Sequence, residues 1–170
     1  VYRALTLAGH LLDHELLFVM REDHPAGVEL VRASHYPVRT FQGDPVLALA
    51  EADPDIVIND ILDTELDYVR ALRDRGWFVV NFEDLGPGNH AAHQVVNALY
   101  NPRYPEPHMV WGPQYADLRD EFYSAPFKII TPEVRRVLVT FGGADPANLT
   151  EKAVRALASL PGEFEVQVIL

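Results

Sequence analysis

The chain has 170 residues, 48% of them hydrophobic, and a formal net charge of −11 from 14 basic and 25 acidic residues. An acidic surface repels phosphate backbones and anionic lipids, so we expect neither nucleic-acid binding nor membrane-surface binding. The sequence has no cysteine, which excludes disulfides, thiolate nucleophiles and cysteine-ligated zinc and fits a cytoplasmic protein. It has no apolar run long enough to span a membrane, and no stretch that resembles a signal peptide.

The first predicted element is a helix over residues 1–12, with Leu5, Ala8 and Leu12 on one side. It leads into a strand over residues 15–20 (ELLFVM). In a doubly wound domain such a helix follows a strand and a ligand-binding loop. We therefore expect a strand and a loop upstream of Val1, so that the chain is a truncated piece of a longer protein.

Short apolar runs recur along the rest of the chain, and several are apolar on both faces, as in strands buried in a parallel sheet. They predict strands at residues 38–41, 55–59, 77–82, 94–98, 109–111, 136–141 and 164–170. Helical patterns lie between them at 46–52, 64–75, 115–122 and 147–160. The alternation predicts an α/β, Rossmann-like doubly wound parallel sheet. We expect a first domain over 1–124, a linker over 125–134 and part of a second domain over 135–170.

Polar residues follow two of the predicted strands, Asn59-Asp60 and Glu83-Asp84. Ligands of open α/β sheets bind outside the carboxyl ends of the strands. Asp60 is therefore the candidate acid or base. Alternatively, Asp60 and Asp63 cap the helix that begins near Thr64, and capping is the favoured interpretation for Asp63.

The stretch 111–122 (WGPQYADLRDEF) predicts a turn at Gly112-Pro113 and then a helix. Large aromatic residues at helical spacing usually pack in a core. We therefore favour an inter-domain strap, with Arg119 paired to Glu121 or Glu83, over direct ligand contact.

The sharpest motif is VLVTFGGADPANLT at 137–150, a strand, a Gly-Gly turn and a helix capped by Asp145-Pro146. Glycines let the backbone approach an anion, and a helix amino terminus offers free N–H groups. The turn therefore fits a diphosphate. A turn of this kind also serves any parallel sheet, so geometry alone leaves both readings open.

Two histidine pairs have spacings that metal sites use, His10 with His14 and His90 with His93. His14 falls beyond the predicted helix, and the second pair lies in a glycine-rich loop without a nearby acid. We therefore predict no metal and no cofactor.

The segments DIVINDILDTELDYVRALRDRG, VVNFEDL, VWGPQYADLRDEFY and FGGADPANLT, in this order, resemble the UDP-sugar hydrolases of pseudaminic acid biosynthesis and their spore-coat polysaccharide relatives. The resemblance spans essentially the whole chain. It implies a GT-B-like fold, a UDP-sugar substrate and displacement of UDP by water. It also implies that the catalytic histidine lies immediately upstream of Val1.

The residues that the resemblance assigns to substrate binding are Arg3, Tyr115, Gly142, Gly143, Ala144, Asp145 and Asn148. Three positions depart from the family pattern. Ile61 stands where the family has a tyrosine, Asn59 replaces an aspartate, and Glu83-Asp84 replaces a pair of aspartates.

Three functions follow as hypotheses: a UDP-sugar hydrolase, a GT-B glycosyltransferase, or a non-catalytic sugar-nucleotide-binding module. The final predicted strand presents an unpaired apolar edge, so we also expect the chain to self-associate.

Overall fold

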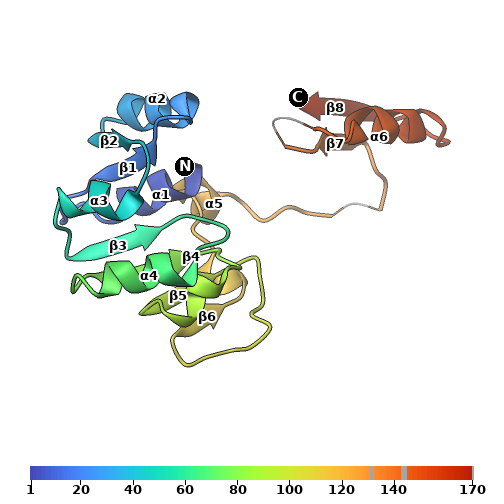
Figure 1. Cartoon of the computed structure of the whole chain (residues 1–170). Coiled ribbons are helices and arrows are strands. Elements are labelled where there is room, and N and C mark those ends of the chain that lie inside the picture. The colour runs from blue at the N-terminus through green and yellow to red at the C-terminus, as the bar shows by residue number, and fades with distance from the viewer. Residues whose placement is uncertain (131, 143–144, 170) are drawn as a thin grey trace. The chain divides into compact units, whose positions relative to one another are not determined.

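The computed structural model describes residues 1–130, 132–142 and 145–169. The chain divides into two compact units, Val1–Ser124 and Ala125–Leu170 (Figure 1). In both units parallel strands alternate with helices. The chain therefore has the predicted Rossmann-like α/β fold.

Most elements of the first unit are short. Its helices are α1 (Tyr2–Gly9), α2 (Pro25–Ala33), α3 (Pro45–Ala50), α4 (Leu66–Arg73) and α5 (Asp120–Ser124), with 3-10 turns η1 (Pro87–His90) and η2 (Pro113–Tyr115). Its strands are β1 (Phe18–Arg21), β2 (Val38–Phe41), β3 (Ile56–Asn59), β4 (Phe78–Phe82), β5 (Gln94–Asn97) and β6 (Met109–Trp111). The second unit contains β7 (Arg136–Thr140), α6 (Leu149–Ala158) and β8 (Glu165–Ile169).

All described strand pairs are parallel. The first unit has a two-stranded sheet, β1-β2, and a four-stranded sheet in the order β3-β4-β5-β6. The second unit has the pair β7-β8. Because consecutive strands of the larger sheet are neighbours and parallel, their carboxyl ends meet along one edge.

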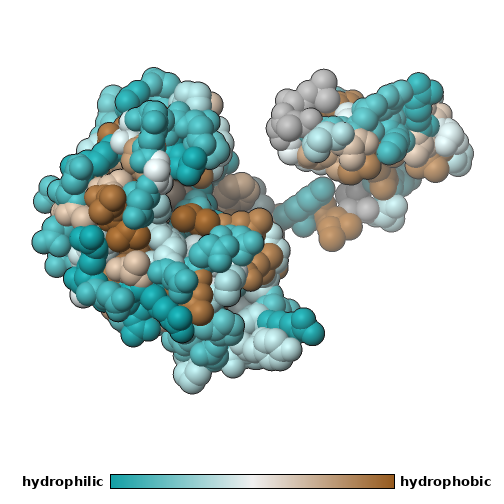
Figure 2. Space-filling model, in the orientation of Figure 1, coloured by the Kyte–Doolittle hydropathy of each residue, from teal (hydrophilic) through white to brown (hydrophobic). Residues whose placement is uncertain are grey.

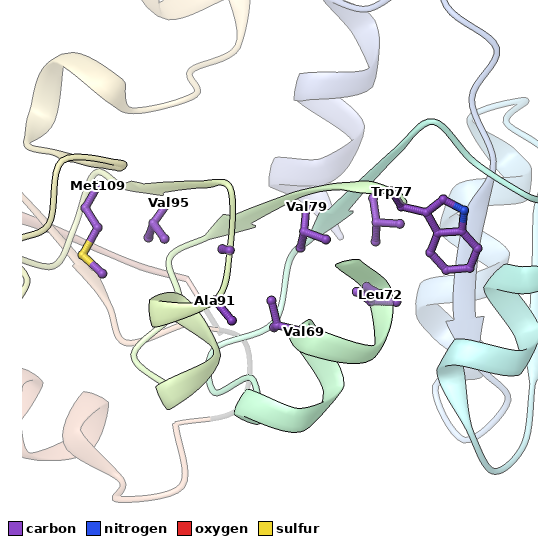
Figure 3. Close-up of a cluster of buried hydrophobic side chains, with 9 residues drawn as sticks. Val69, Leu72, Trp77, Val79, Ala91, Val95 and Met109 are labelled. Atoms are coloured by element: carbon purple, nitrogen blue, oxygen red, sulfur yellow. The ribbon is translucent and has the colours of Figure 1, made fainter. Parts of the chain in front are cut away.

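The core of the first unit lies between α4 and the larger sheet (Figure 3). Val69 and Leu72 of α4 point toward Val79 of β4, and all three side chains are fully buried. Trp77 lies at one end of this cluster and Met109 at the other. Burying a side chain of this size contributes about 1.5–3 kcal/mol, so this cluster stabilises the packing of α4 on the larger sheet.

Two predicted helix boundaries have the expected cause. Asp44 caps α3 by accepting a hydrogen bond from the Val46 N–H at 2.8 Å. Gly76 ends the helical segment with φ +87°, and its N–H donates to the Arg73 carbonyl at 2.8 Å. The prediction that Asp63 caps the following helix is wrong, because α4 has Glu65 at its N-cap and no side-chain cap.

The other differences from the sequence-based elements are local. The strand predicted at 15–20 begins only at Phe18, and the sequence did not predict α2, which opens on Pro25. The helix predicted at 115–122 is wrong. Ala116 has extended backbone angles (φ −68°, ψ 125°), which end η2 at Tyr115, and helix resumes only at Asp120.

The His93 side chain accepts a hydrogen bond from the backbone of β4. The Val79 N–H donates to His93 Nδ1 at 3.0 Å, and the ring stacks on Phe78 with centroids 4.6 Å apart. The acceptor role requires an unprotonated Nδ1. Burial, and to a lesser extent the charge of Arg73, lower the pKa of His93.

A lowered histidine pKa has a definite effect on stability. Below the unfolded-state pKa of about 6.5 the unfolded chain binds more protons. The contribution of His93 is therefore present above that pH and declines as the pH falls. We expect His93→Asn, whose Oδ1 can replace Nδ1 as acceptor, to reduce the loss of stability between pH 7 and pH 5. Urea unfolding at both pH values checks this; an unchanged pH dependence would contradict it.

Apolar side chains are exposed in several places on the surface, partly along the segment after Ser124 (Figure 2). Phe127, Ile129 and Ile130 of that segment are almost fully exposed. Self-association stays a prediction. Within the described residues, no helix combines the length and apolar character needed to cross a membrane.

Candidate active site

The carboxyl edge of the larger sheet brings together an arginine and two carboxylates. Arg3 of α1 reaches Asp60, which follows β3: its Nε donates to Oδ1 at 3.0 Å, and its Nη2 donates to the same oxygen. Arg3 Nη1 also lies 3.8 Å from Glu83 Oε1, after β4. The predicted residues Arg3 and Asp60 are thus in direct contact, and Glu83 joins them.

Glu83 organises the next loop along this edge. Its backbone has φ +49°, and its side chain is 6% exposed. Its carboxylate accepts hydrogen bonds from the Ala98 N–H at 2.6 Å and the Leu99 N–H at 3.1 Å. Glu83 therefore links α1 to the chain that leaves β5. Positive φ at a non-glycine residue is uncommon and clusters at functional sites.

A buried polar network lies beside these residues. The Asp84 carboxylate accepts hydrogen bonds from the Thr64 N–H, the Gly86 N–H and Asn81 Nδ2 at 3.0, 2.7 and 2.7 Å, and another from Thr64 Oγ1. The Asp84 carbonyl accepts from the side-chain amides of Asn89 and Asn97. Every oxygen of the residue is occupied, so Asp84 fixes the loops instead of facing a ligand.

The ends of β3 and β4 are joined by a pair of amides. Asn59 Nδ2 donates to Asn81 Oδ1 at 2.9 Å, and the Tyr68 hydroxyl donates to Asn59 Oδ1 at 2.9 Å. Burial, with a contribution from Asp44, raises the pKa of Tyr68 to about 12. Tyr68 is therefore a neutral donor, and the asparagine at position 59 has a structural role.

A further carboxylate points inward from the segment between η2 and α5. The Asp117 side chain is 12% exposed, and its Oδ1 lies 3.9 Å from His10 Nε2. Its Oδ2 is buried without a hydrogen-bond partner among the described residues. Burial raises the pKa of Asp117, while the charges of His10 and Arg3 act in the opposite direction.

The other predicted residues of the first unit are more exposed. Tyr115 ends η2 and Ile61 follows Asp60, and neither makes a polar side-chain contact among the described interactions. Arg119 Nη1 lies 3.9 Å from Glu121 Oε1, which is one of its two predicted partners, and the guanidinium also lies over the Phe122 ring.

The glycine turn of the second unit is only partly described. Gly142 has φ +80° and open space where a Cβ would lie; Gly143 and Ala144 lie outside the described residues. The prediction that Asp145 is the N-cap and Pro146 the first-turn proline is wrong, because the N-cap of α6 is Asn148. Asp145 still caps the first turn from three residues further upstream, since its carboxylate accepts from the Leu149 and Thr150 N–H groups, both at 2.8 Å. The helix begins at Leu149, later than the predicted 147, because Asn148 has a left-handed backbone.

This cap changes what α6 can offer to an anion. The carboxylate of Asp145 already occupies two N–H groups of the first turn. Asn148 Nδ2 donates to Glu151. The Leu149 and Thr150 N–H groups are therefore not free to bind an anion. The open hollow of the second unit lies elsewhere, at the amino ends of β7 and β8, beside Arg135 and Phe164.

Within the described residues, no group of three or more His, Asp or Glu side chains is arranged to hold a metal ion. His90 Nδ1 contacts the Glu106 carboxylate, and His93 Nδ1 accepts a hydrogen bond from the backbone of β4. His10 is different, because it meets Asp117.

The chain matches no protein-family model. It is 29% identical over 188 aligned residues to the uncharacterized protein MJ1062 of Methanocaldococcus jannaschii. The alignment covers all of this chain and 39% of that relative. This chain therefore spans about two fifths of the archaeal relative's length, and the likeness carries no assignment of activity.

Sequence reasoning missed Asp117 and His10 as members of the site. One signal was available: Arg3 and His10 are seven residues apart, which is two turns of a helix and places both on one face. Nothing local to Asp117 indicated that it turns toward α1.

Proposed function

We propose that this chain is the sugar-nucleotide-binding part of a hydrolase that releases UDP from an amino-deoxy sugar in cell-surface glycan biosynthesis. The observation that carries the proposal is the cluster of Arg3, Asp60 and Glu83 at the carboxyl edge of a parallel sheet. Ligands of open α/β sheets bind at this edge. The carboxylate oxygens of Asp60 and Glu83 can accept hydrogen bonds from the hydroxyl and amide groups of a sugar.

The strand–turn–helix of the second unit supports the nucleotide part of the proposal. β7 ends at Thr140, and Gly142 follows with a positive φ and no neighbour where a Cβ would lie. A glycine turn of this kind lets backbone N–H groups reach an anion. We propose the 142–144 turn as the diphosphate-binding element, in place of the first turn of α6.

The family resemblance belongs to the same proposal. FGGADPANLT and GPQYADLRDEF are its most specific segments. A cytoplasmic location fits a chain without cysteine. No cofactor is needed for displacement of UDP by water.

Calorimetric titration of UDP into the full chain, with UMP as reference, tests the nucleotide site. We expect UDP to bind at least about tenfold more tightly than UMP, a difference of about 1.4 kcal/mol. Gly142→Ala is expected to abolish the difference, and Gly162→Ala is its matched control. Both glycines have positive φ (+80° and +114°) and open surroundings, so alanine strains the backbone at both positions. Equal binding of UDP and UMP would contradict the diphosphate assignment.

Product analysis with UDP-N-acetylglucosamine as probe tests the reaction. Free sugar and UDP are the expected products. A sugar conjugate formed with an added acceptor would indicate the glycosyltransferase instead. Tight UDP binding without turnover would indicate a non-catalytic binding module.

A further inference from the structure

The carboxylates of the site differ in what their oxygens bind. Asp60 Oδ1 accepts two hydrogen bonds from Arg3. Glu83 is held by the Ala98 and Leu99 N–H groups. The Asp117 Oδ2 atom alone of these is buried without any hydrogen-bond partner in the described parts of the chain. A buried carboxylate oxygen without a donor is costly, and such atoms often mark a catalytic role or an absent ligand.

The neighbour of Asp117 is a group that can exchange protons with solvent. His10 Nε2 lies 3.9 Å from Asp117 Oδ1, and the His10 side chain is 50% exposed. His10 is the C-cap of α1. The pair therefore joins a buried proton acceptor to an exposed one.

The pair belongs to the same region as the arginine cluster. Arg3 and His10 lie two turns apart on one face of α1, with Cα atoms about 10 Å apart along its axis. The charges of both residues act on Asp117. α1 therefore presents Arg3 to the ends of β3 and β4, and His10 to the segment after β6.

We infer that Asp117 and His10 are the proton-transfer pair of this site, with Asp117 in the role that the sequence suggested for Asp60. The inference rests on the proposed hydrolase function. The oxygen of a water molecule forms a bond to the anomeric carbon as its proton passes to Asp117 Oδ2. The bond from that carbon to the diphosphate oxygen breaks, and its electron pair leaves with UDP.

His10 then restores the base. The proton passes from Asp117 to the unprotonated Nε2 of His10 and from there to solvent. Asp60 holds Arg3 in place and takes no proton. General bases of this kind contribute about 10²- to 10⁴-fold to a rate.

The charged groups around Asp117 determine the expected pH profile. His10 and Arg3 face it from α1; on its own segment, Arg119 is paired with Glu121. A base must be deprotonated to act, so activity is expected to fall as the pH drops through the raised pKa of Asp117. His10→Gln removes a group that lowers the pKa of Asp117 and is expected to shift this limb to higher pH.

The test measures UDP release from UDP-N-acetylglucosamine by the full chain and by three variants. We expect Asp117→Asn to lower kcat about 100-fold or more with little change in KM. His10→Gln is expected to lower kcat less and to shift the acidic limb. The control is Asp120→Asn, an exposed aspartate in α5, which should leave kcat unchanged. Circular dichroism melting verifies that each variant is folded.

Carbon-13 NMR of the aspartate carboxyls gives a second readout that does not depend on activity. Asp117 is expected to titrate above ordinary aspartates, and higher still in His10→Gln. A wild-type kcat in Asp117→Asn would overturn the inference while the hydrolase function stands. The inference would also be overturned if the pKa of Asp117 were that of an ordinary aspartate and did not change in His10→Gln. Absence of UDP release together with equal binding of UDP and UMP would reject the proposed function, and the catalytic role of the pair with it. Absence of UDP release with tighter binding of UDP than of UMP would overturn the catalytic role of the pair alone.

Discussion

Replacing Asp84 with alanine is expected to destabilise the first unit by about 3–5 kcal/mol, as for removal of one partner from a buried charged network. The carboxylate is fully buried and accepts from Thr64, Asn81 and Gly86. Alanine leaves the backbone N–H groups of Thr64 and Gly86 without this acceptor in the buried interior, while Asn81 Nδ2 keeps Thr64 Oγ1 and Asn89 Oδ1 as acceptors. Each unsatisfied buried donor costs about 1–3 kcal/mol.

Urea unfolding followed by tryptophan fluorescence isolates this effect, because both tryptophans, Trp77 and Trp111, lie in the first unit. Asp67→Ala is the matched control: its side chain is 97% exposed, in the first turn of α4. It is expected to change stability by less than about 0.5 kcal/mol. If Asp84→Ala unfolded at the same urea concentration as Asp67→Ala, the network would not be what holds the loops.

The fold class could be predicted because parallel strands carry a strong local signal. Residues 55–59 and 77–82 are apolar on both faces, and they became β3 and β4. The expected burial of both faces is wrong, because Ile56, Ile58 and Phe78 are exposed. The capping residues Asp44 and Asp145 also act through neighbours two to five positions away. Signals of such short range are present in the sequence itself.

The errors arose where long-range packing decides the local structure. α2 was missed because its buried face consists only of Val28 and Val31. The helix predicted at 115–122 fails because Asp117 turns inward in an extended segment. In a short segment, tertiary packing can override a local preference for helix, even where the sequence has helical periodicity.

The place of Asp60 in the fold was predicted, but its contacts were not. The rule for open α/β sheets placed Asp60 at the carboxyl edge of the sheet. It could not show that Arg3 occupies that carboxylate, or that Asp117 meets His10. These contacts join residues far apart in the sequence, and no local pattern encodes them. Asp63 likewise has no capping role, because α4 begins only at Leu66 and Glu65 is its N-cap.

Gly86→Ala is expected to destabilise the first unit by about 3 kcal/mol, at the upper end of the cost of overpacking. An added Cβ would fall well inside van der Waals contact of the Thr64 backbone nitrogen and oxygen, and 2.6 Å from Asp63 Oδ1. Backbone atoms cannot rotate away as a flexible side chain can. Thr64 would have to move, and with it the hydrogen bonds that Thr64 donates to Asp84.

The control for this prediction is Gly9→Ala in α1, where nothing lies within 4 Å of the added Cβ. Alanine favours the helix there, so this variant is expected to gain about 0.5 kcal/mol. Tryptophan-detected urea unfolding of both variants gives the comparison. Gly86→Ala displaces the backbone of Thr64 but keeps the Asp84 side chain. If it lowers stability as much as Asp84→Ala does, the hydrogen-bond network around Asp84 depends on the position of Thr64. If Gly86→Ala is as stable as wild type, the loop that contains Gly86 moves to accommodate the Cβ. The network around Asp84 would then not depend on the position of Thr64.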